Sequence, residues 1–362
     1  MSDNKSLDDV YSEAIALYEL YKSNSSDSAS PIIKFHPSYK NKRADDVFSS
    51  LFTVGDAQLV LAREHGFENL LEWHGVIASE NKNTPPLAHH ERVSDIEFRQ
   101  AIDLIDSGEH EELVRLLAKN PQLVRERVNL ESGDYFSTPT LLEFCAENPT
   151  RCNSLPENIV EIAKSILDAG AKENQQAKDS LLALVCSGRI VRECGVQLPL
   201  IELLYNYGAN VDLAMHASVS HGEFEAVNAL IAFGATVTLS TAAAIGDMNT
   251  IKQLYADASP IERHHALAQA AQHGHANIVT FLLEQSEDPN RFNPDGSHAH
   301  STPLHQAAIA GHLDVVKTLV KYGANVQVKD TLHNAAPVDW AKHGGDASVI
   351  DYLTALGDSP NM

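Results

Sequence analysis

From about residue 100 to the C-terminus, apolar and small residues recur with one spacing. A small residue is followed twelve positions later by the residue that ends the next helix, and apolar residues stand five and eight positions after the first one, as Leu113 and Leu116 do. Positions three apart share one face of a helix, so each unit carries the same apolar stripe. A short helix pair cannot bury such a stripe alone, so the spacing predicts a solenoid of stacked pairs, which is typical of binding scaffolds. The spacing recurs in Gly108/Asn120, Gly222/Gly234, Gly246/Ala258, Gly274/Ser286, Gly311/Gly323 and Gly345/Gly357.

The first eighty residues are helical in pattern but lack this repeat. Apolar residues at helical intervals predict an amphipathic helix over residues 7–21, which the polar run 23–28 ends. Two further helices are expected over 56–63, with Asp56 as N-cap, and over 68–78. We therefore divide the chain into a helical region at 1–80, a linker at 81–94, a repeat array at 95–357 and a tail at 358–362.

The clearest repeat is the segment 301–330, STPLHQAAIAGHLDVVKTLVKYGANVQVKD. Thr302 can cap its first helix, and Pro303 suits the first helical turn. Gly311 makes the turn, and Gly323 can take the left-handed conformation that ends helices. This segment resembles an ankyrin repeat, close to that family's pattern TPLHxAAxxGHxxVVxxLLxxGAxxN. The resemblance predicts an all-α ankyrin-repeat solenoid of about eight helix pairs, preceded by the small N-terminal helical region.

Two units depart from the twelve-residue rule. Gly188 to Gly208 spans twenty residues with an insertion near 192–199, and Asn148 to Gly170 spans twenty-two with an insertion near 149–156. We interpret both as ankyrin units with an extended turn between their helices. The final unit, 337–357, carries polar residues that suit a terminal cap.

The order of motifs also resembles a bacterial family of ankyrin proteins of unassigned activity. Its DAQLV-xARE-x-GF hairpin is matched at 56–67, and its NPxLVRxR segment at 120–127. Its TLLHxxAxN segment is matched in part at 140–148, where Glu143 replaces the histidine. The resemblance covers nearly the whole chain, and it implies the architecture without implying a biochemical role.

Charge and composition narrow the range of partners. The formal net charge of −22 argues against general nucleic-acid binding and against binding to anionic membranes, because both need a basic surface. It is compatible with a basic protein partner, but an acidic surface more often only maintains solubility. No signal peptide or membrane span is expected, and four cysteines without a CxxC pair indicate reduced thiols. We expect a cytoplasmic monomer.

Candidate chemistry is sparse. The sequence contains no G-x-S-x-G elbow, phosphate-binding loop or H-E-x-x-H pair, so we expect no catalytic residue and no cofactor. The ankyrin resemblance implies a structural hydrogen bond for His305 and structural positions for His275 and His312. His298 and His300 alternate in a loop and could take up adventitious zinc or nickel, but they lack the third and fourth ligands that zinc requires. No metal site is expected.

The remaining candidate is a surface. Residues just before the turn glycines and in the loops vary while the architecture is constant, which suggests that this face selects a partner protein. Phe292 is the best candidate for an aromatic anchor. The expected function is a protein–protein interaction scaffold; the alternatives are a regulatory adaptor with a second partner on the N-terminal helices, and an enzyme with a site where those helices meet the array. The predicted contact residues are His221, Ile245, Gln272, His273, Arg291, Phe292, Asn293, Ile309, Lys329 and His333.

Overall fold

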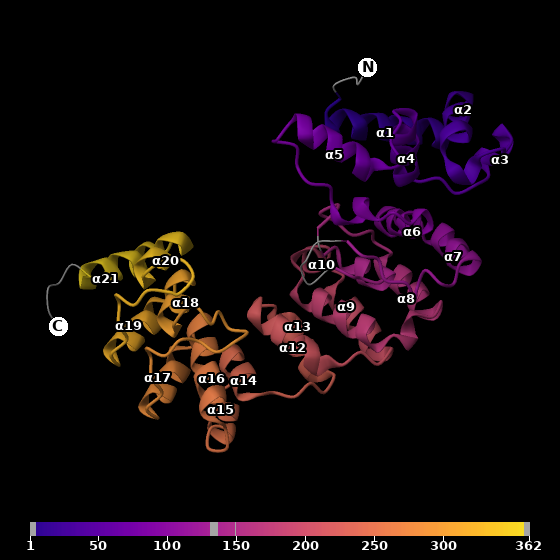
Figure 1. Cartoon of the computed structure of the whole chain (residues 1–362). Coiled ribbons are helices and arrows are strands. Elements are labelled where there is room, and N and C mark those ends of the chain that lie inside the picture. Colours follow the sequence, from indigo (N-terminus) through magenta and orange to yellow (C-terminus); the bar gives the residue numbers. More distant parts are fainter. Residues whose placement is uncertain (1–4, 131–136, 149, 358–362) are drawn as a thin grey trace. The chain divides into compact units, whose positions relative to one another are not determined.

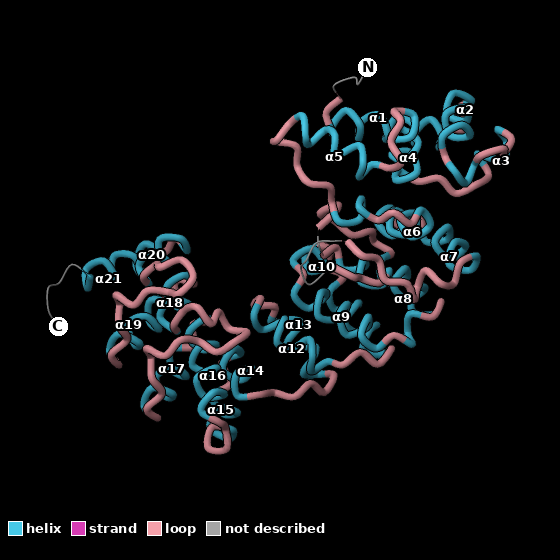
Figure 2. The backbone as a smooth tube through the Cα atoms, viewed as in Figure 1, coloured by secondary structure: helices cyan, strands magenta, loops and turns pink. Residues whose placement is uncertain are grey.

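The computed structural model describes residues 5–130, 137–148 and 150–357. Helices are the only regular elements within those ranges, apart from an isolated bridge between Arg127 and Thr140 (Figures 1 and 2). The expected all-α fold class is therefore confirmed. The chain forms two compact units, unit 1 over Met1–Asn210 and unit 2 over Val211–Met362. The predicted tail at 358–362 lies outside the described residues.

Unit 1 begins with five helices around one apolar core, which includes Val10, Ile32, Val47, Val60 and Trp73. The helices of unit 1 are α1 (Leu7–Lys22), α2 (Ser26–Phe35), α3 (Ala44–Phe48), α4 (Val54–Glu64), α5 (Leu70–Glu80), α6 (Ile96–Ser107), α7 (His110–Lys119), α8 (Ile159–Asp168), α9 (Gln175–Ser187), α10 (Arg189–Glu193) and α11 (Gln197–Asn206). Short 3-10 turns cover η1 (Pro37–Tyr39), η2 (His89–Arg92), η3 (Leu141–Ala146) and η4 (Ala171–Glu173).

The three helices predicted in the N-terminal region correspond to α1, α4 and α5. The prediction that Asp56 is the N-cap of its helix is wrong. Thr53 is the N-cap, and Asp56 is the third residue of a capping box, accepting a hydrogen bond from the Thr53 backbone N–H at 2.7 Å. Helices α2 and α3 were not predicted, because α2 begins in a serine-rich segment and contains Pro31.

The segment predicted as a linker, 81–94, packs onto the N-terminal helices. Leu87 is 2% exposed, and the Glu91 carboxylate accepts hydrogen bonds from Tyr11 at 2.9 Å and from Gln58 at 3.2 Å. The segment therefore belongs to the packing of unit 1, and the domain boundaries proposed from the sequence stay predictions.

The two extended turns are ordered in different ways. The insertion after Gly188 contains the short helix α10, and α11 follows at Gln197. In the extended turn before α8, the Arg151 side chain is 1% exposed and forms ion pairs with Asp106 at 2.6 Å and Glu147 at 3.2 Å. A buried charge network thus holds this turn against α6.

Unit 2 contains five further helix pairs. Its helices are α12 (Val211–Ser220), α13 (Phe224–Ala232), α14 (Leu239–Ile245), α15 (Met248–Leu254), α16 (Pro260–Gln272), α17 (Ala276–Glu284), α18 (Pro303–Ile309), α19 (Leu313–Lys321), α20 (Pro337–Gly344) and α21 (Ala347–Gly357). Helices α12, α14, α16, α18 and α20 each contact the next and form an inner row, and α17, α19 and α21 form part of an outer row (Figure 1). Paired alanines such as Ala307 and Ala308 are fully buried in the inner row, where their small size lets helices approach closely.

The turn glycines and the histidines that follow them join neighbouring repeats. Gly246 has φ 79°, and the ring of His275 from the next repeat lies where a Cβ would project. His275 Nε2 is 2.8 Å from the Ala244 carbonyl oxygen, and His312 Nε2 is 3.0 Å from that of Gln272. His305 Nε2 reaches the Ala335 carbonyl at 3.2 Å. The structural roles predicted for these three histidines are confirmed.

Candidate functional site

The candidate site lies on the side of unit 2 formed by the inner row and by the loops 235–238, 287–302 and 326–336 that lead into it. We call this side the inner surface. It contains two hollows, of about 410 and about 510 Å³. Concave surfaces with mixed apolar and polar linings are the usual binding places on a protein.

The larger, C-terminal hollow brings three segments together: the loop before α18, the end of α18, and α20 with the loop before it. Ile309 and His333, both predicted contact residues, meet here. The complete lining is His298, Ile309, His333, Ala335, Asp339, Trp340 and His343.

A buried carboxylate fixes one wall of the C-terminal hollow. Asp330, 3% exposed, accepts hydrogen bonds from the backbone N–H groups of Leu332 at 2.9 Å, His333 at 2.5 Å and Ala335 at 3.1 Å, and from Trp340 Nε1 at 2.9 Å. Burial alone would raise the pKa of this carboxyl, but those donors hold it well below its usual range. The loop and the Trp340 ring are therefore fixed in place before any partner binds.

The N-terminal hollow is lined mainly by hydroxyl and imidazole groups. The His216 and His265 rings meet edge to face at 6.3 Å, and His265 Nε2 is 2.6 Å from Ser297 Oγ. None of its lining residues was among the predicted contacts. The lining is Asp212, Met215, His216, Val219, Thr236, Thr238, Ser240, Thr241, His265 and Gln269.

The predicted contacts omitted these residues because they were chosen from the ends of the inner helices and from the loops, and not from the first turns of those helices. The available signal was the run of threonine, serine and histidine at the start of α14 and along α16. Trp340 and His343 were missed for a related reason: the last repeat was interpreted only as a cap.

Three predicted residues at the ends of α14 and α16 are partly engaged within unit 2. Ile245 is half-buried, and Gln272 Nε2 donates to the Ser220 carbonyl at 3.3 Å. His273 is half-buried with its ring edge-on to Phe224 at 5.1 Å, and burial lowers its pKa to about 4. These contacts join α16 to α12 and α13, so they contribute to the fold.

The loop before α18 gives a correction. Asn293 is 4% exposed, its side chain lies 3.3 Å from Ser301 Oγ, and it stabilises the loop instead of facing a partner. Phe292 is half-buried, and its carbonyl oxygen is 3.0 Å from His264 Nε2. The other predicted contacts, His221, Arg291, Lys329 and His333, are exposed.

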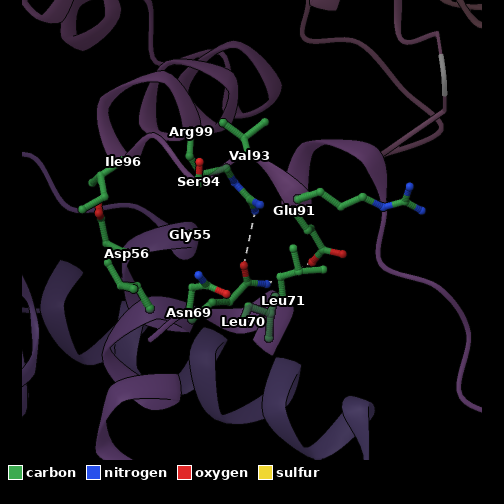
Figure 3. Close-up of a pocket in the computed structure, with 13 residues that line it drawn as sticks. Gly55, Asp56, Asn69, Leu70, Leu71, Glu91, Val93, Ser94, Ile96 and Arg99 are labelled. Atoms are coloured by element: carbon green, nitrogen blue, oxygen red, sulfur yellow. Dashed lines mark hydrogen bonds between the residues drawn. The ribbon is translucent and has the colours of Figure 1, made fainter. Parts of the chain in front are cut away.

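A small cavity of about 70 Å³ lies where the N-terminal helices meet α6 (Figure 3). Arg99 crosses it and donates to Gln58 Oε1 at 3.3 Å. It also donates to Asp103 at 2.8 Å and to the His90 carbonyl at 3.0 Å. A Cβ at Gly55 would lie 2.8 Å from Arg99 Cγ, so a side chain at this position would displace Arg99. The polar groups of Arg99 are bonded to protein neighbours and the space admits only a few waters, so this cavity offers no free guanidinium group to a ligand.

The described part of the chain contains neither a cluster of metal ligands nor a membrane-spanning helix. No group of three His, Cys, Asp or Glu residues there is arranged to hold a metal ion, and the His298 and His300 rings lie 6.0 Å apart, edge to face. No helix among the described residues combines the length and apolar character needed to cross a membrane.

Comparison with known proteins places residues 239–330 in a family model described as ankyrin repeats (3 copies). The rat cyclin-dependent kinase 4 inhibitor B is 34% identical over 130 residues, which is 34% of this chain and 97% of the rat protein. The ankyrin repeat and KH domain-containing protein mask-1 of Caenorhabditis elegans is 26% identical over 221 residues, 56% of this chain and 8% of that protein. Alpha-latrocrustotoxin-Lt1a of Latrodectus tredecimguttatus is 40% identical over 89 residues, 24% of this chain and 6% of the toxin. The chain thus spans nearly all of the rat relative and a small fraction of the other two.

Proposed function

This chain belongs to the ankyrin-repeat family, and from that premise we propose that it binds a partner protein through the inner surface of unit 2 and performs no chemistry of its own. The contacts would come from the loops, from the first turns of the inner helices and from the two hollows. The proposal names the surface and the class of partner, which is a protein.

The observation that carries the proposal is the position of the exposed apolar side chains. Leu213, Ile261 and Leu332 are 59%, 56% and 66% exposed, and each lies at the start of an inner helix or in the loop leading into one. Among the described residues of unit 2, the other large exposed apolar side chain is Leu254, at 37% on the outer helix α15. A single exposed leucine needs no explanation, but three of the four large exposed apolar side chains in the described part of unit 2 stand where the chain enters an inner helix, and this favours a contact surface there.

The relatives support the class of function. The rat relative is by name an inhibitor of a cyclin-dependent kinase, so its name describes action on another protein. The repeat architecture supports the same conclusion, because stacked repeats present a long surface whose side chains vary without disturbing the core.

The test is a comparison of captured proteins. A triple variant, Leu213→Ser, Ile261→Ser and Leu332→Ser, and a control variant, Leu254→Ser, would be used as bait beside the wild type. We expect the triple variant to lose the partner while retaining the wild-type circular-dichroism melt, and the control to retain both. A folded triple variant that captures the same proteins would contradict the proposal.

We also propose a cytoplasmic location, a bacterial source and a monomeric state. Four cysteines without a CxxC pair support a cytoplasmic location, and the motif at 56–67 supports a bacterial source. We propose a monomer, which light scattering at several concentrations would test. A second partner on the N-terminal helices stays a prediction.

A further inference from the structure

We infer that the C-terminal hollow of the inner surface takes a lysine or arginine side chain of the partner, and that acidification releases it. This inference rests on the proposed function of the inner surface. It adds the chemistry of the anchoring residue and a dependence on pH.

The hollow has the right lining for a long cationic side chain. Ile309 and Ala335 offer apolar surface for the aliphatic stem, and the rings of Trp340, His298 and His333 offer aromatic surface near the head group. Trp340 already donates its indole N–H to Asp330, so it offers an occupant its ring and not a donor.

Asp339 is the acid that an occupant can reach. Its side chain is 52% exposed: Oδ2 accepts the Ala336 backbone N–H at 3.1 Å, and Oδ1 lies 3.4 Å from Lys342 Nζ, which is 58% exposed. Exposed pairs of this kind are weak, so an incoming cation can replace the lysine. Asp330, in contrast, is buried and its oxygens already accept four N–H groups.

The charge of the whole unit favours a cation over an anion. Residues 211–362 contain sixteen Asp and Glu against seven Lys and Arg. Such an imbalance produces a negative potential that attracts cations and repels carboxylates. Neutral imidazoles do not oppose this potential, so near neutral pH the hollow accepts a cation.

Protonation weakens that preference because histidines surround the hollow. The loop before α18 contributes His298 and His300, and His221 at the end of α12 lies close enough to His298 to influence its charge. The loop before α20 contributes Asp330 and His333, α20 contributes Asp339, Lys342 and His343, and His305 lies behind the Trp340 ring at 5.2 Å. Burial, and then the neighbouring His300 and His221, lower the pKa of His298.

The sign of the pH effect follows from this arrangement. Each proton taken up by the lining imidazoles places a positive charge beside the bound cation, so affinity falls as pH falls. A carboxylate in the hollow would show the opposite trend, and a purely apolar side chain would show neither. The direction of the pH dependence therefore identifies the occupant.

The experiment uses three capped Gly-Ser peptides that differ only in a central Lys, Glu or Leu. Each is titrated into the ¹⁵N-labelled full chain while the Trp340 indole signal is followed, with Trp73→Phe used to assign it. We expect only the Lys peptide to shift the signal saturably at pH 7.5, and its affinity to fall about fivefold at pH 5.5.

Asp339→Asn should weaken binding of the Lys peptide about fivefold at pH 7.5. Asp314→Asn removes an exposed acid from the outer helix α19 and should leave the affinity for the Lys peptide unchanged.

The outcomes separate this inference from the proposed function. Preferential binding of the Glu or Leu peptide, stronger Lys binding at pH 5.5, or an unshifted Trp340 signal with all three peptides would overturn the inference. If in that case the Leu213/Ile261/Leu332 variant still loses its partner, the proposed function stands. If that variant keeps its partner, the proposed function fails whatever the peptides show.

Discussion

Unit 1 and unit 2 are built from similar helix pairs, yet they satisfy their buried polar groups differently. In unit 1, charged side chains pair with each other, as in Arg99–Asp103 at 2.8 Å and Arg151–Asp106 at 2.6 Å. In unit 2, the joining groups are imidazoles bonded to backbone carbonyls, as His275 and His312 are. In the regular repeats, a carbonyl at the equivalent position, two residues before the turn glycine, faces each of these histidines. In the irregular turns of unit 1, each buried charged side chain has a partner specific to its own position. The two units should therefore respond to different perturbations.

Each unit contains one tryptophan, so the two can be followed separately. Trp73 lies in the core of unit 1 at 5% exposed, and Trp340 lies in unit 2. Variants that keep one tryptophan, Trp340→Phe or Trp73→Phe, report the unfolding of unit 1 or unit 2 in urea.

The largest effect is expected from Arg151→Met. It leaves Asp106 and Glu147 near each other without their cation, and such a change typically costs about 3–5 kcal/mol in the free energy of unfolding. The loss should be seen by Trp73. Arg115→Met removes an arginine that is 65% exposed and also pairs with two glutamates, and it should change stability by less than about 1 kcal/mol. Equal effects of the two variants would show that the buried network does not hold unit 1.

A smaller effect is expected from Gly344→Ala in unit 2. A Cβ at Gly344 would overlap the carbonyl oxygen of Ile309, so α20 must move away from α18, at a cost of about 1–3 kcal/mol seen by Trp340. The matched control is Gly75→Ala in α5, where a Cβ meets nothing within 4 Å, and it should stabilise unit 1 by about 0.5–1 kcal/mol. A Gly344→Ala protein as stable as the wild type would mean that the inner row tolerates wider spacing.

Sequence patterns predicted the features that repeat. The turn glycines and the paired alanines follow from positions that recur at fixed spacing, because each copy meets the same neighbours. The roles of His275, His305 and His312 were implied by the ankyrin resemblance. Ile309 and His333 of the C-terminal hollow could be predicted for this reason. Trp340 is a single feature of the last repeat, and no other copy indicated its place.

Features without a repeating pattern could not be predicted from the sequence. Arg151 is buried because Asp106, forty-five residues earlier, lies beside it, and no local pattern encodes that pairing. Asn293 was expected to be exposed because it lies in a loop. It is buried because that irregular loop folds back and brings Ser301 against it, which no repeating pattern indicates. The cap of α4 was misassigned because Thr53 and Asp56 both suit capping, and only the backbone shows which one begins the helix.

The smallest effect tests whether unit 2 depends on neutral imidazoles. Burial, followed by the nearby His275, lowers the pKa of His273 to about 4 in the folded chain, against an ordinary value of 6.5 for histidine. As pH falls, the unfolded chain therefore binds a proton at His273 before the folded chain does. The contribution of the neutral His273 ring to the free energy of unfolding is fully present above about pH 6.5 and is lost as pH falls toward 4. His273→Phe keeps the ring contact with Phe224 and removes the titration. Between pH 6.5 and 4 the free energy of unfolding of this variant should therefore fall by about 1–2 kcal/mol less than that of the wild type, measured by urea unfolding with Trp340.

His221→Phe, at an exposed position, serves as the control and should follow the wild-type curve. Identical curves for His273→Phe and the wild type would show that this imidazole is hydrated in the folded chain, and the contrast between charge pairs in unit 1 and neutral rings in unit 2 would lose its clearest example.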